Sequence, residues 1–330
     1  MTSDAPSPAI LRWALALAVE APSVHNSQPW LWRVGERSVD LYANPDLALP
    51  HTDPDARDLI LSCGAALNHV QIALAAVGWQ AKIRRFPDAE KPDHLATAEL
   101  RRYRPVEADI VLASAIPRRR TDRRNYSSRP VPGAAIALMG ARAARAGVML
   151  RQFDELTTLK RRVIDAEERH HDDPGYAAEL TTWSGRYGST AGVPARSTPH
   201  ADPRAAIPAR IFAGAALEQP ADAEPSADNA AVLALGTVAD DRMSQLRAGE
   251  ATSLVLLTAT AAGLASCPIT GPLEIPDIRA AVAQDVFGSS GHAQMLLRIG
   301  WAPAHAEALP RTPRRPLNQV VTWLSHERAG

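Results

Sequence analysis

The first hundred residues alternate between helical and strand-like spacing of apolar positions. Apolar side chains recur at helical intervals from Ile10 to about residue 20, behind Ser7 and Pro8, which suit an N-cap and a first helical turn. Strands are predicted near 30–34 and 38–43, then a long helix opened by Asp53-Pro54 and closed by Gly78, then strands near 80–86 and 96–104. This region is therefore predicted to fold as helix, hairpin, helix, hairpin.

The rest of the chain mixes helices and strands less regularly. Helices are predicted at about 130–147, 154–171, 174–184, 240–263 and 276–287, and strands at 148–153, 230–237 and 293–300. The mixture indicates an α+β architecture, which we divide into halves at 1–108 and 109–330.

Residues 185–229 form a segment of another kind. The segment is rich in Pro, Gly, Ala and Ser and has almost no periodicity, which predicts a lid-like cover over another surface rather than a core element. Its apolar side chains are expected to dock against a pocket: Val193, Ile207, Ile211, Phe212 and Leu217.

Composition excludes several classes of protein. The 330 residues carry a formal net charge of zero, which gives no reason to expect a nucleic acid or an anionic membrane as partner. Two cysteines predict no disulfide framework, and no signal peptide precedes the first helix, so we expect a cytoplasmic location. The uncharged stretch 251–273 is too polar and interrupted to span a membrane. His170, His171 and His200 lack metal-ligand spacing, and no metal site is predicted.

Residues 21–30 read APSVHNSQPW and are the densest group of ligand-binding side-chain types in the chain. Proline and serine stiffen and turn the backbone after a helix, and His25, Asn26 and Gln28 then offer donors and acceptors before an apolar strand begins. Loops in such a position often carry function. The alternative is a well-capped turn.

Three further motifs bear on a binding site. Residues 118–124 read RRRTDRR, either a solvated basic turn or a phosphate cradle in which guanidinium groups and the Thr121 hydroxyl bind phosphate oxygens. Residues 312–317 read TPRRPL, a rigid turn presenting two more arginines. Residues 266–271 read SCPITG, which predicts a tight turn whose backbone N–H groups face a ligand.

Together these motifs resemble the nitroreductase family of FMN-dependent proteins, and the whole-chain pattern resembles its actinobacterial Acg-type branch. The first motif resembles the family's PS..N.QPW signature, residues 119–132 its arginine-containing phosphate motif, residues 267–271 the loop that contacts flavin N5, and 314–317 its C-terminal phosphate-binding arginines. The resemblance implies a three-layer α-β-α fold and FMN as cofactor. It assigns cofactor binding to the following residues: Pro22, Ser23, His25, Asn26, Gln28, Arg119, Arg120, Thr121, Arg123, Pro268, Ile269, Thr270, Gly271, Arg314 and Arg315.

The order of the motifs departs from that family. There the arginine motif precedes PS..N.QPW, whereas here it follows by roughly ninety residues, and Arg12 alone stands ahead of the first motif. In the family the phosphate cradle lies on one subunit and PS..N on the other. We therefore interpret the chain as a fused pseudo-dimer of two related halves that keeps one complete flavin site, and expect a monomer.

The resemblance leaves two functions open. One is an oxidoreductase in which FMN takes hydride from NAD(P)H and reduces a nitroaromatic, a quinone or a similar small acceptor, with no catalytic side chain required. The other is a protein that stores or sequesters FMN, its lid excluding the nicotinamide. A dinucleotide-binding dehydrogenase is disfavoured because no G-x-G-x-x-G follows a strand.

Overall fold

The computed structural model describes residues 5–185, 188–202, 204–220 and 224–324. The helices are α1 (Pro8–Ala18), α2 (Arg57–Ala76), α3 (Glu107–Ala115), α4 (Gly133–Arg145), α5 (Leu156–His171), α6 (Pro174–Trp183), α7 (Arg242–Ala261), α8 (Pro276–Phe287) and α9 (Leu317–Val320). The strands are β1 (Trp30–Val34), β2 (Ser38–Ala43), β3 (Trp79–Arg85), β4 (His94–Arg102), β5 (Met149–Gln152), β6 (Ala231–Thr237), β7 (Ala265–Ile269), β8 (His292–Gly300) and β9 (Val321–Trp323). Helices and strands are mixed, as the hydrophobic pattern predicts.

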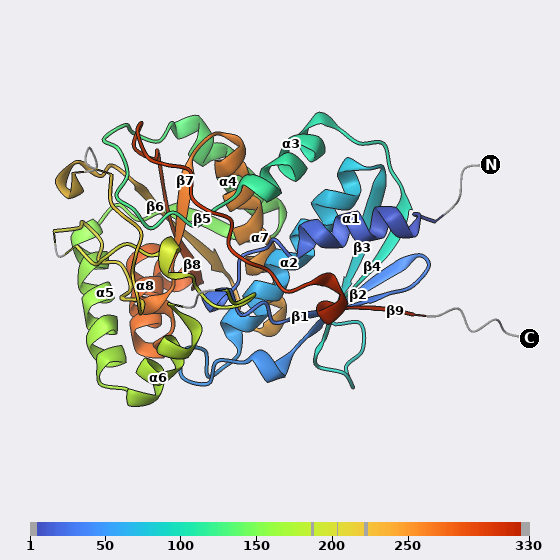
Figure 1. Cartoon of the computed structure of the whole chain (residues 1–330), viewed down its shortest axis with the longest axis horizontal. Coiled ribbons are helices and arrows are strands. Elements are labelled where there is room, and N and C mark those ends of the chain that lie inside the picture. The colour runs from blue at the N-terminus through green and yellow to red at the C-terminus, as the bar shows by residue number, and fades with distance from the viewer. Residues whose placement is uncertain (1–4, 186–187, 203, 221–223, 325–330) are drawn as a thin grey trace, which may run out of the picture.

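Two sheets lie on either side of the helix pair α2 and α7 (Figure 1). The order of the first sheet is β3-β4-β2-β1-β9, and that of the second is β5-β6-β8-β7. Neighbouring strands are antiparallel except β1 and β9, which are parallel. The predicted succession of helix, hairpin, helix, hairpin in the first hundred residues is confirmed.

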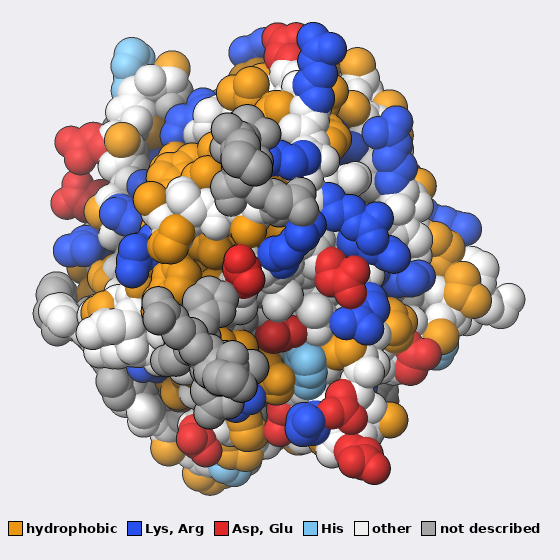
Figure 2. Space-filling model, turned by 90° about the vertical axis from the view of Figure 1, so that its right-hand side faces the viewer, with side chains coloured by type: hydrophobic (Ala, Val, Ile, Leu, Met, Phe, Trp, Pro, Cys, Tyr) orange, Lys and Arg blue, Asp and Glu red, His pale blue; other side chains and the backbone are white. Residues whose placement is uncertain are grey.

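The second sheet has helices on both faces and forms the predicted three-layer α-β-α arrangement. Alternate β6 residues point to opposite faces: Leu233 and Leu235 pack with α4 and α7, whereas Val232 and Ala234 pack with α5 and α8. The first sheet buries one face against α1 and α2, and its other face carries polar side chains such as Lys82. Figure 2 shows the molecule from the right-hand side of Figure 1, where basic and acidic side chains are interspersed.

The pair α2 and α7 is related by an approximate two-fold symmetry. Each helix has 20 residues, and their first residues lie 185 positions apart. With that offset Gly64 corresponds to Gly249 and Leu61 to Leu246. A Cβ at Gly64 would lie 2.2 Å from the Leu246 carbonyl oxygen, and one at Gly249 would lie 2.1 Å from that of Leu61. Such reciprocal contacts are typical of a symmetric dimer interface, so the helix crossing has the symmetry expected of a fused pseudo-dimer.

Four details differ from the sequence-based expectations. Helix α2 begins at Arg57 rather than Asp53, whose carboxylate instead caps it by accepting from the N–H groups of Asp58 and Leu59. Residues 265–269 are an edge strand rather than a turn; Pro268 is tolerated because an edge position needs no second ladder bond. Helix α3 and strand β9 were not predicted, since α3 is apolar without clear periodicity and β9 has three residues.

Strand β9 is the C-terminal end of the described chain, yet it pairs with β1 in the first sheet (Figure 1). Residues that follow the second sheet in sequence thus return across the molecule. This return carries Arg314 and Arg315 to the loop between α1 and β1. The topology explains how a motif near residue 315 and a motif near residue 25 meet.

Candidate functional site

The loop between α1 and β1 holds the first motif in a strained backbone conformation. His25, Asn26 and Gln28 have φ values of 46°, 54° and 56°, in the left-handed region that non-glycine residues rarely adopt. The Ser23 hydroxyl accepts a hydrogen bond from the Gln28 N–H at 3.0 Å, which fixes the turn. Strain of this kind concentrates at binding sites, so it favours a functional role over a simple capped turn.

A cavity opens beside this loop, lined by residues between 22 and 65 and by residues between 121 and 298. Its accessible volume is about 160 Å³, and concave places of this kind are where small molecules bind. Nine of the predicted site residues line it: Pro22, Ser23, His25, Thr121, Arg123, Pro268, Ile269, Thr270 and Gly271. The structure therefore brings the first motif, part of the arginine motif and the 266–271 segment to one place.

The remaining six predicted residues form a second group at one side of the cavity: Asn26, Gln28, Arg119, Arg120, Arg314 and Arg315. The group adjoins the cavity because Arg119 Nη1 lies 3.5 Å from the Thr121 hydroxyl oxygen. Arg314 Nη1 donates to Asn26 Oδ1 at 3.1 Å, which joins the C-terminal motif to the first. We call Arg119, Arg120, Arg314 and Arg315 the basic cluster.

The basic cluster carries more positive charge than its surroundings neutralise. Burial, followed by the nearby Arg314 cation, lowers the pKa of Arg119 to about 9, and burial lowers that of Arg314 to about 10. Glu20 opposes both shifts, but its carboxylate is also bonded to Arg311. Within the described residues, Nε of all four cluster arginines lacks a hydrogen-bond partner. Unused donors and unbalanced charge are properties of an anion site.

Asn26 and Gln28 hold the site together through bonds to other protein groups. Gln28 Oε1 accepts from the Arg315 N–H at 2.8 Å, and its Nε2 donates to the Thr190 carbonyl at 2.8 Å. Asn26 Nδ2 donates to the Gly192 carbonyl at 3.1 Å. These amides thus tie the C-terminal motif and the 185–229 segment to the loop.

Arg210, which the sequence analysis did not select, enters the cavity from the 185–229 segment. Its guanidinium donates to Glu274 at 2.5 Å, to the Thr270 hydroxyl at 3.1 Å, and lies 3.2 Å from His25 Nε2. Burial and then the Arg210 cation lower the pKa of His25 well below its usual range, so that imidazole is neutral. A single arginine in a stretch of Pro and Ala gives no pattern by which sequence could identify it.

The apolar side chains of the 185–229 segment behave as expected with one exception. Ile207 and Phe212 line the cavity, and Val193 is buried. Leu217 is half-buried, with a β-bridge to Pro199. The expectation for Ile211 was wrong, since its side chain is 67% exposed. Arg210 and Phe212 both point into the cavity, so the residue between them faces solvent.

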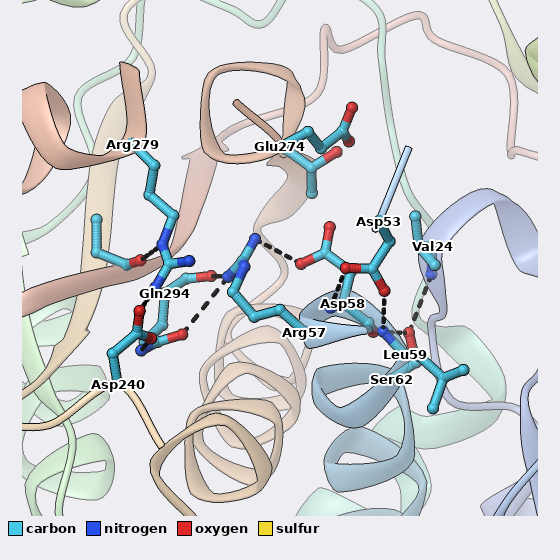
Figure 3. Close-up of polar contacts among 12 residues, drawn as sticks. Val24, Asp53, Arg57, Asp58, Leu59, Ser62, Asp240, Glu274, Arg279 and Gln294 are labelled. Atoms are coloured by element: carbon cyan, nitrogen blue, oxygen red, sulfur yellow. Dashed lines mark hydrogen bonds and ion pairs between the residues drawn. The ribbon is translucent and has the colours of Figure 1, made fainter. Parts of the chain in front are cut away.

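A buried network of charged side chains borders the cavity near the start of α2 (Figure 3). Arg57 Nη2 lies 2.5 Å from Asp58 Oδ1, and Arg57 Nη1 donates to the Gln294 carbonyl at 2.7 Å. Asp58 lines the cavity, and also a smaller one that Asp53 borders. Burial and then the Asp58 charge raise the pKa of Asp53 to about 7. The sequence analysis treated this stretch as a helix start within the pattern that resembles the Acg-type branch, and assigned none of these residues to the site.

Metal and membrane sites were also considered. Among the residues that the structure describes, no group of three or more His, Cys, Asp or Glu side chains is placed to hold a metal ion. One described helix, α2, is long and apolar enough to cross a membrane by length and composition, and 78% of its most apolar stretch is buried inside the protein.

No model of a protein family matches the chain. Among proteins of Mycobacterium tuberculosis, it is 59% identical over 323 residues to "Putative NAD(P)H nitroreductase Rv3131", covering 98% of this chain and 94% of that protein. It is 35% identical to "Putative NAD(P)H nitroreductase acg", covering 94% of this chain and 95% of that one. The chain belongs to the nitroreductase family, in its Acg-type branch. The resemblance of the four motifs is thereby confirmed at the level of the family.

Solved structures of nitroreductases are more distant. One from Bacteroides fragilis with bound FMN is 14% identical, with a TM-score of 0.40, over 62% of this chain and 94% of that chain. The FMN-dependent nitroreductase NfnB of Mycobacterium smegmatis, in complex with NADPH, is 15% identical, with a TM-score of 0.41, over 66% of this chain and 100% of that one.

Proposed function

We propose that this member of the nitroreductase family binds FMN and acts as an NAD(P)H-dependent oxidoreductase on a nitroaromatic, a quinone or a similar small acceptor. The single observation that carries the proposal is the basic cluster beside the cavity. Four arginines with an unused Nε donor each, all of them with pKa values lowered by burial, match the charge and acceptor oxygens of a phosphomonoester.

The residues divide between the two ends of such a ligand. Arg119, Arg120 and Arg314 would hold the phosphate, whereas the cavity walls at His25 and 268–271 would enclose the ring. Bound FMN supplies hydride acceptance and electron transfer, while the protein orients the ring and limits solvent access. We place the protein in the cytoplasm. We also propose two halves, 1–108 and 109–330, in which the C-terminal segment of the second half ends in β9 and pairs with strand β1 of the first.

We expect purified protein to bind FMN at least tenfold more tightly than riboflavin. The two ligands share ring and ribityl chain, so the difference isolates the phosphate, whose charge-assisted hydrogen bonds contribute roughly 1.5–3 kcal/mol each. Fluorescence quenching of each flavin on titration with apo-protein measures both constants. Equal affinities would remove the basis for the assignment.

The symmetry of α2 and α7 explains why we infer one site rather than two. With the offset of 185 positions, the cavity-lining Ala65 and Thr270 correspond to Glu250 and Arg85. At the symmetry-related place Arg85 Nη2 donates to Glu250 Oε2 at 2.6 Å, and Gln71 Nε2 donates to Glu250 Oε1 at 3.4 Å. The ion pair of Arg85 and Glu250 therefore occupies the place that corresponds to the small cavity-lining residues Ala65 and Thr270.

The expected stoichiometry is therefore one FMN per chain, in a monomer. Analytical ultracentrifugation combined with flavin absorbance, at protein concentrations far above the dissociation constant, measures both quantities. Two flavins per chain would show that the Arg85–Glu250 ion pair does not close the second place. A flavin held only by a dimer would show that the site is not complete in one chain.

A second candidate function, FMN storage, is favoured by a specific observation: Ile207, Arg210 and Phe212 of the 185–229 segment line the cavity. We propose that this segment is a lid that restricts access of NAD(P)H to the ring. Anaerobic mixing of the flavin-loaded protein with NADPH, followed by absorbance of the oxidised flavin, separates the two functions. Slow or absent bleaching supports storage, and rapid bleaching with turnover of a nitro compound supports the oxidoreductase.

A further inference from the structure

At the start of α2, neither oxygen of the Asp58 carboxylate accepts a hydrogen bond from the described residues, and Oδ1 alone has an ion-pair contact, with Arg57. The Asp58 side chain is 4% exposed, and Oδ1 lies 2.5 Å from Arg57 Nη2. Among the described residues no group donates a hydrogen bond to Oδ2. In Figure 3 one oxygen of Asp58 faces Arg57 and the other points away from it. A buried acceptor of this kind requires an explanation, because native proteins rarely leave one unpaired.

The surroundings fix this carboxylate in its orientation. Arg57 is itself held by the Gln294 backbone carbonyl at 2.7 Å and by Gln294 Oε1 at 3.5 Å. Gln294 Nε2 in turn donates to Asp240 Oδ1 at 2.8 Å. The guanidinium is therefore not free to turn and cover the second oxygen. Asp58 also lines the cavity, so its side chain lies beside any molecule bound there.

We propose that Asp58 binds the cofactor directly, its free oxygen accepting a hydrogen bond from an N–H or O–H group of the flavin. This inference rests on the proposed function. A flavin has donors of both kinds, the ring imide N–H and the ribityl hydroxyls, and oxidised flavin has no cationic group to pair with the carboxylate. Arg57 supplies the opposite charge beside this buried carboxylate. Asp58 is then a cofactor-binding residue on α2, separate from the arginines of the basic cluster.

The substitution Asp58→Asn tests this assignment. Arg57 presents only donors, so it retains the amide oxygen of the new side chain and turns the NH₂ group toward the cavity. The acceptor is thereby replaced by a neutral donor, which opposes a ligand N–H and removes the charge-assisted hydrogen bond from a ligand O–H. We expect FMN affinity to fall at least tenfold. Asp277→Asn is the control, since it changes a carboxylate that is exposed, pairs with Arg169 and lines neither cavity, and its FMN affinity should match the wild type.

The flavin analogue 3-methyl-FMN identifies the donor, because it keeps the hydroxyls and lacks the imide N–H. If Asp58 accepts from the imide, wild type prefers FMN over the analogue and Asp58→Asn loses that preference. If it accepts from a hydroxyl, the substitution weakens both ligands equally. Either result supports the proposal. Affinity for both ligands equal to that of wild type would overturn it.

The reduction potential of the bound flavin gives an independent readout. Reduction adds negative charge to the ring, and a neighbouring carboxylate disfavours that charge. Asp58→Asn should therefore raise the midpoint potential, and Asp277→Asn should leave it unchanged. If Asp58→Asn does not fold, the variant Arg57→Met with Asp58→Asn removes both charges and should show the same losses.

The two proposals fail in different ways. Wild-type protein that binds neither FMN nor riboflavin overturns the proposed function and this inference together. Wild-type protein that binds FMN, with a potential and affinity that Asp58→Asn leaves unchanged, overturns this inference alone.

Discussion

Replacing Arg119 by methionine is expected to weaken FMN binding about 10- to 100-fold and, at the same time, to stabilise the protein without ligand. The guanidinium is buried, and burial together with Arg314 lowers its pKa to about 9, so the folded state disfavours the charge. A phosphate makes use of that charge through bonds of roughly 1.5–3 kcal/mol each. Without phosphate the same charge is a cost, and replacing buried charges by apolar side chains often gains about 1–4 kcal/mol.

Arg118→Met is the matched control for this substitution. Arg118 belongs to the same run of arginines, but it is exposed, and its Nε donates to the Ser114 carbonyl on α3. We expect its FMN affinity and melting temperature to equal those of wild type. Isothermal titration with FMN and thermal unfolding of the ligand-free proteins measure the two effects. An Arg119→Met variant that unfolds at a lower temperature, or that keeps its FMN affinity, would contradict the assignment of a preformed anion site.

The sequence identified short local motifs that the structure brings together, and it missed side chains whose partners lie far away along the chain. The turn at 22–28, the arginines at 119–123 and the segment 268–271 were recognised because each is a short run with unusual residue types. The expectation that these motifs meet in one site came from the resemblance to the nitroreductase family, and not from hydrophobic periodicity. Arg210 was missed because its partners Glu274 and His25 lie 64 and 185 positions away.

The symmetry of the two helices was present in the sequence but hidden by divergence. Gly64 and Gly249, with Leu61 and Leu246, hold the same places in α2 and α7, and Gly78 and Gly263 follow both helix ends with positive φ. Comparing the chain with itself at an offset of 185 residues would have found them. Hydrophobic periodicity alone does not, because both helices are buried on most sides and their apolar positions mark no single face.

The second large effect concerns the proposed lid, which Arg210 fastens to both halves of the chain. Its guanidinium bonds Glu274 and Thr270 from the second half and lies 3.2 Å from His25 of the first. Phe212 adds an edge contact to the His25 ring and lies under the Arg123 guanidinium. If these contacts keep the lid closed, their loss should expose the ring to NADPH.

We therefore expect Arg210→Met combined with Glu274→Gln to speed anaerobic reduction of bound FMN by NADPH at least tenfold. The second substitution is needed because removing Arg210 alone would leave a buried carboxylate without its closest cation, a change that costs about 3–5 kcal/mol. Arg204→Met is the matched control, since that lid arginine is 73% exposed and pairs only with Asp202 among the described groups.

Replacing residues 190–225 by a short Gly/Ser linker should reproduce the faster reduction, provided FMN is retained. Stopped-flow absorbance of the oxidised flavin gives the rates, and an FMN titration of each variant shows whether the cofactor is still held. The contacts of Arg210 do not include the basic cluster. Opening of the lid should therefore change the rate of flavin reduction with little change in FMN affinity. Equal rates in all four proteins would mean that the 185–229 segment does not limit access to the flavin, and that any slow turnover has its cause in the cavity itself.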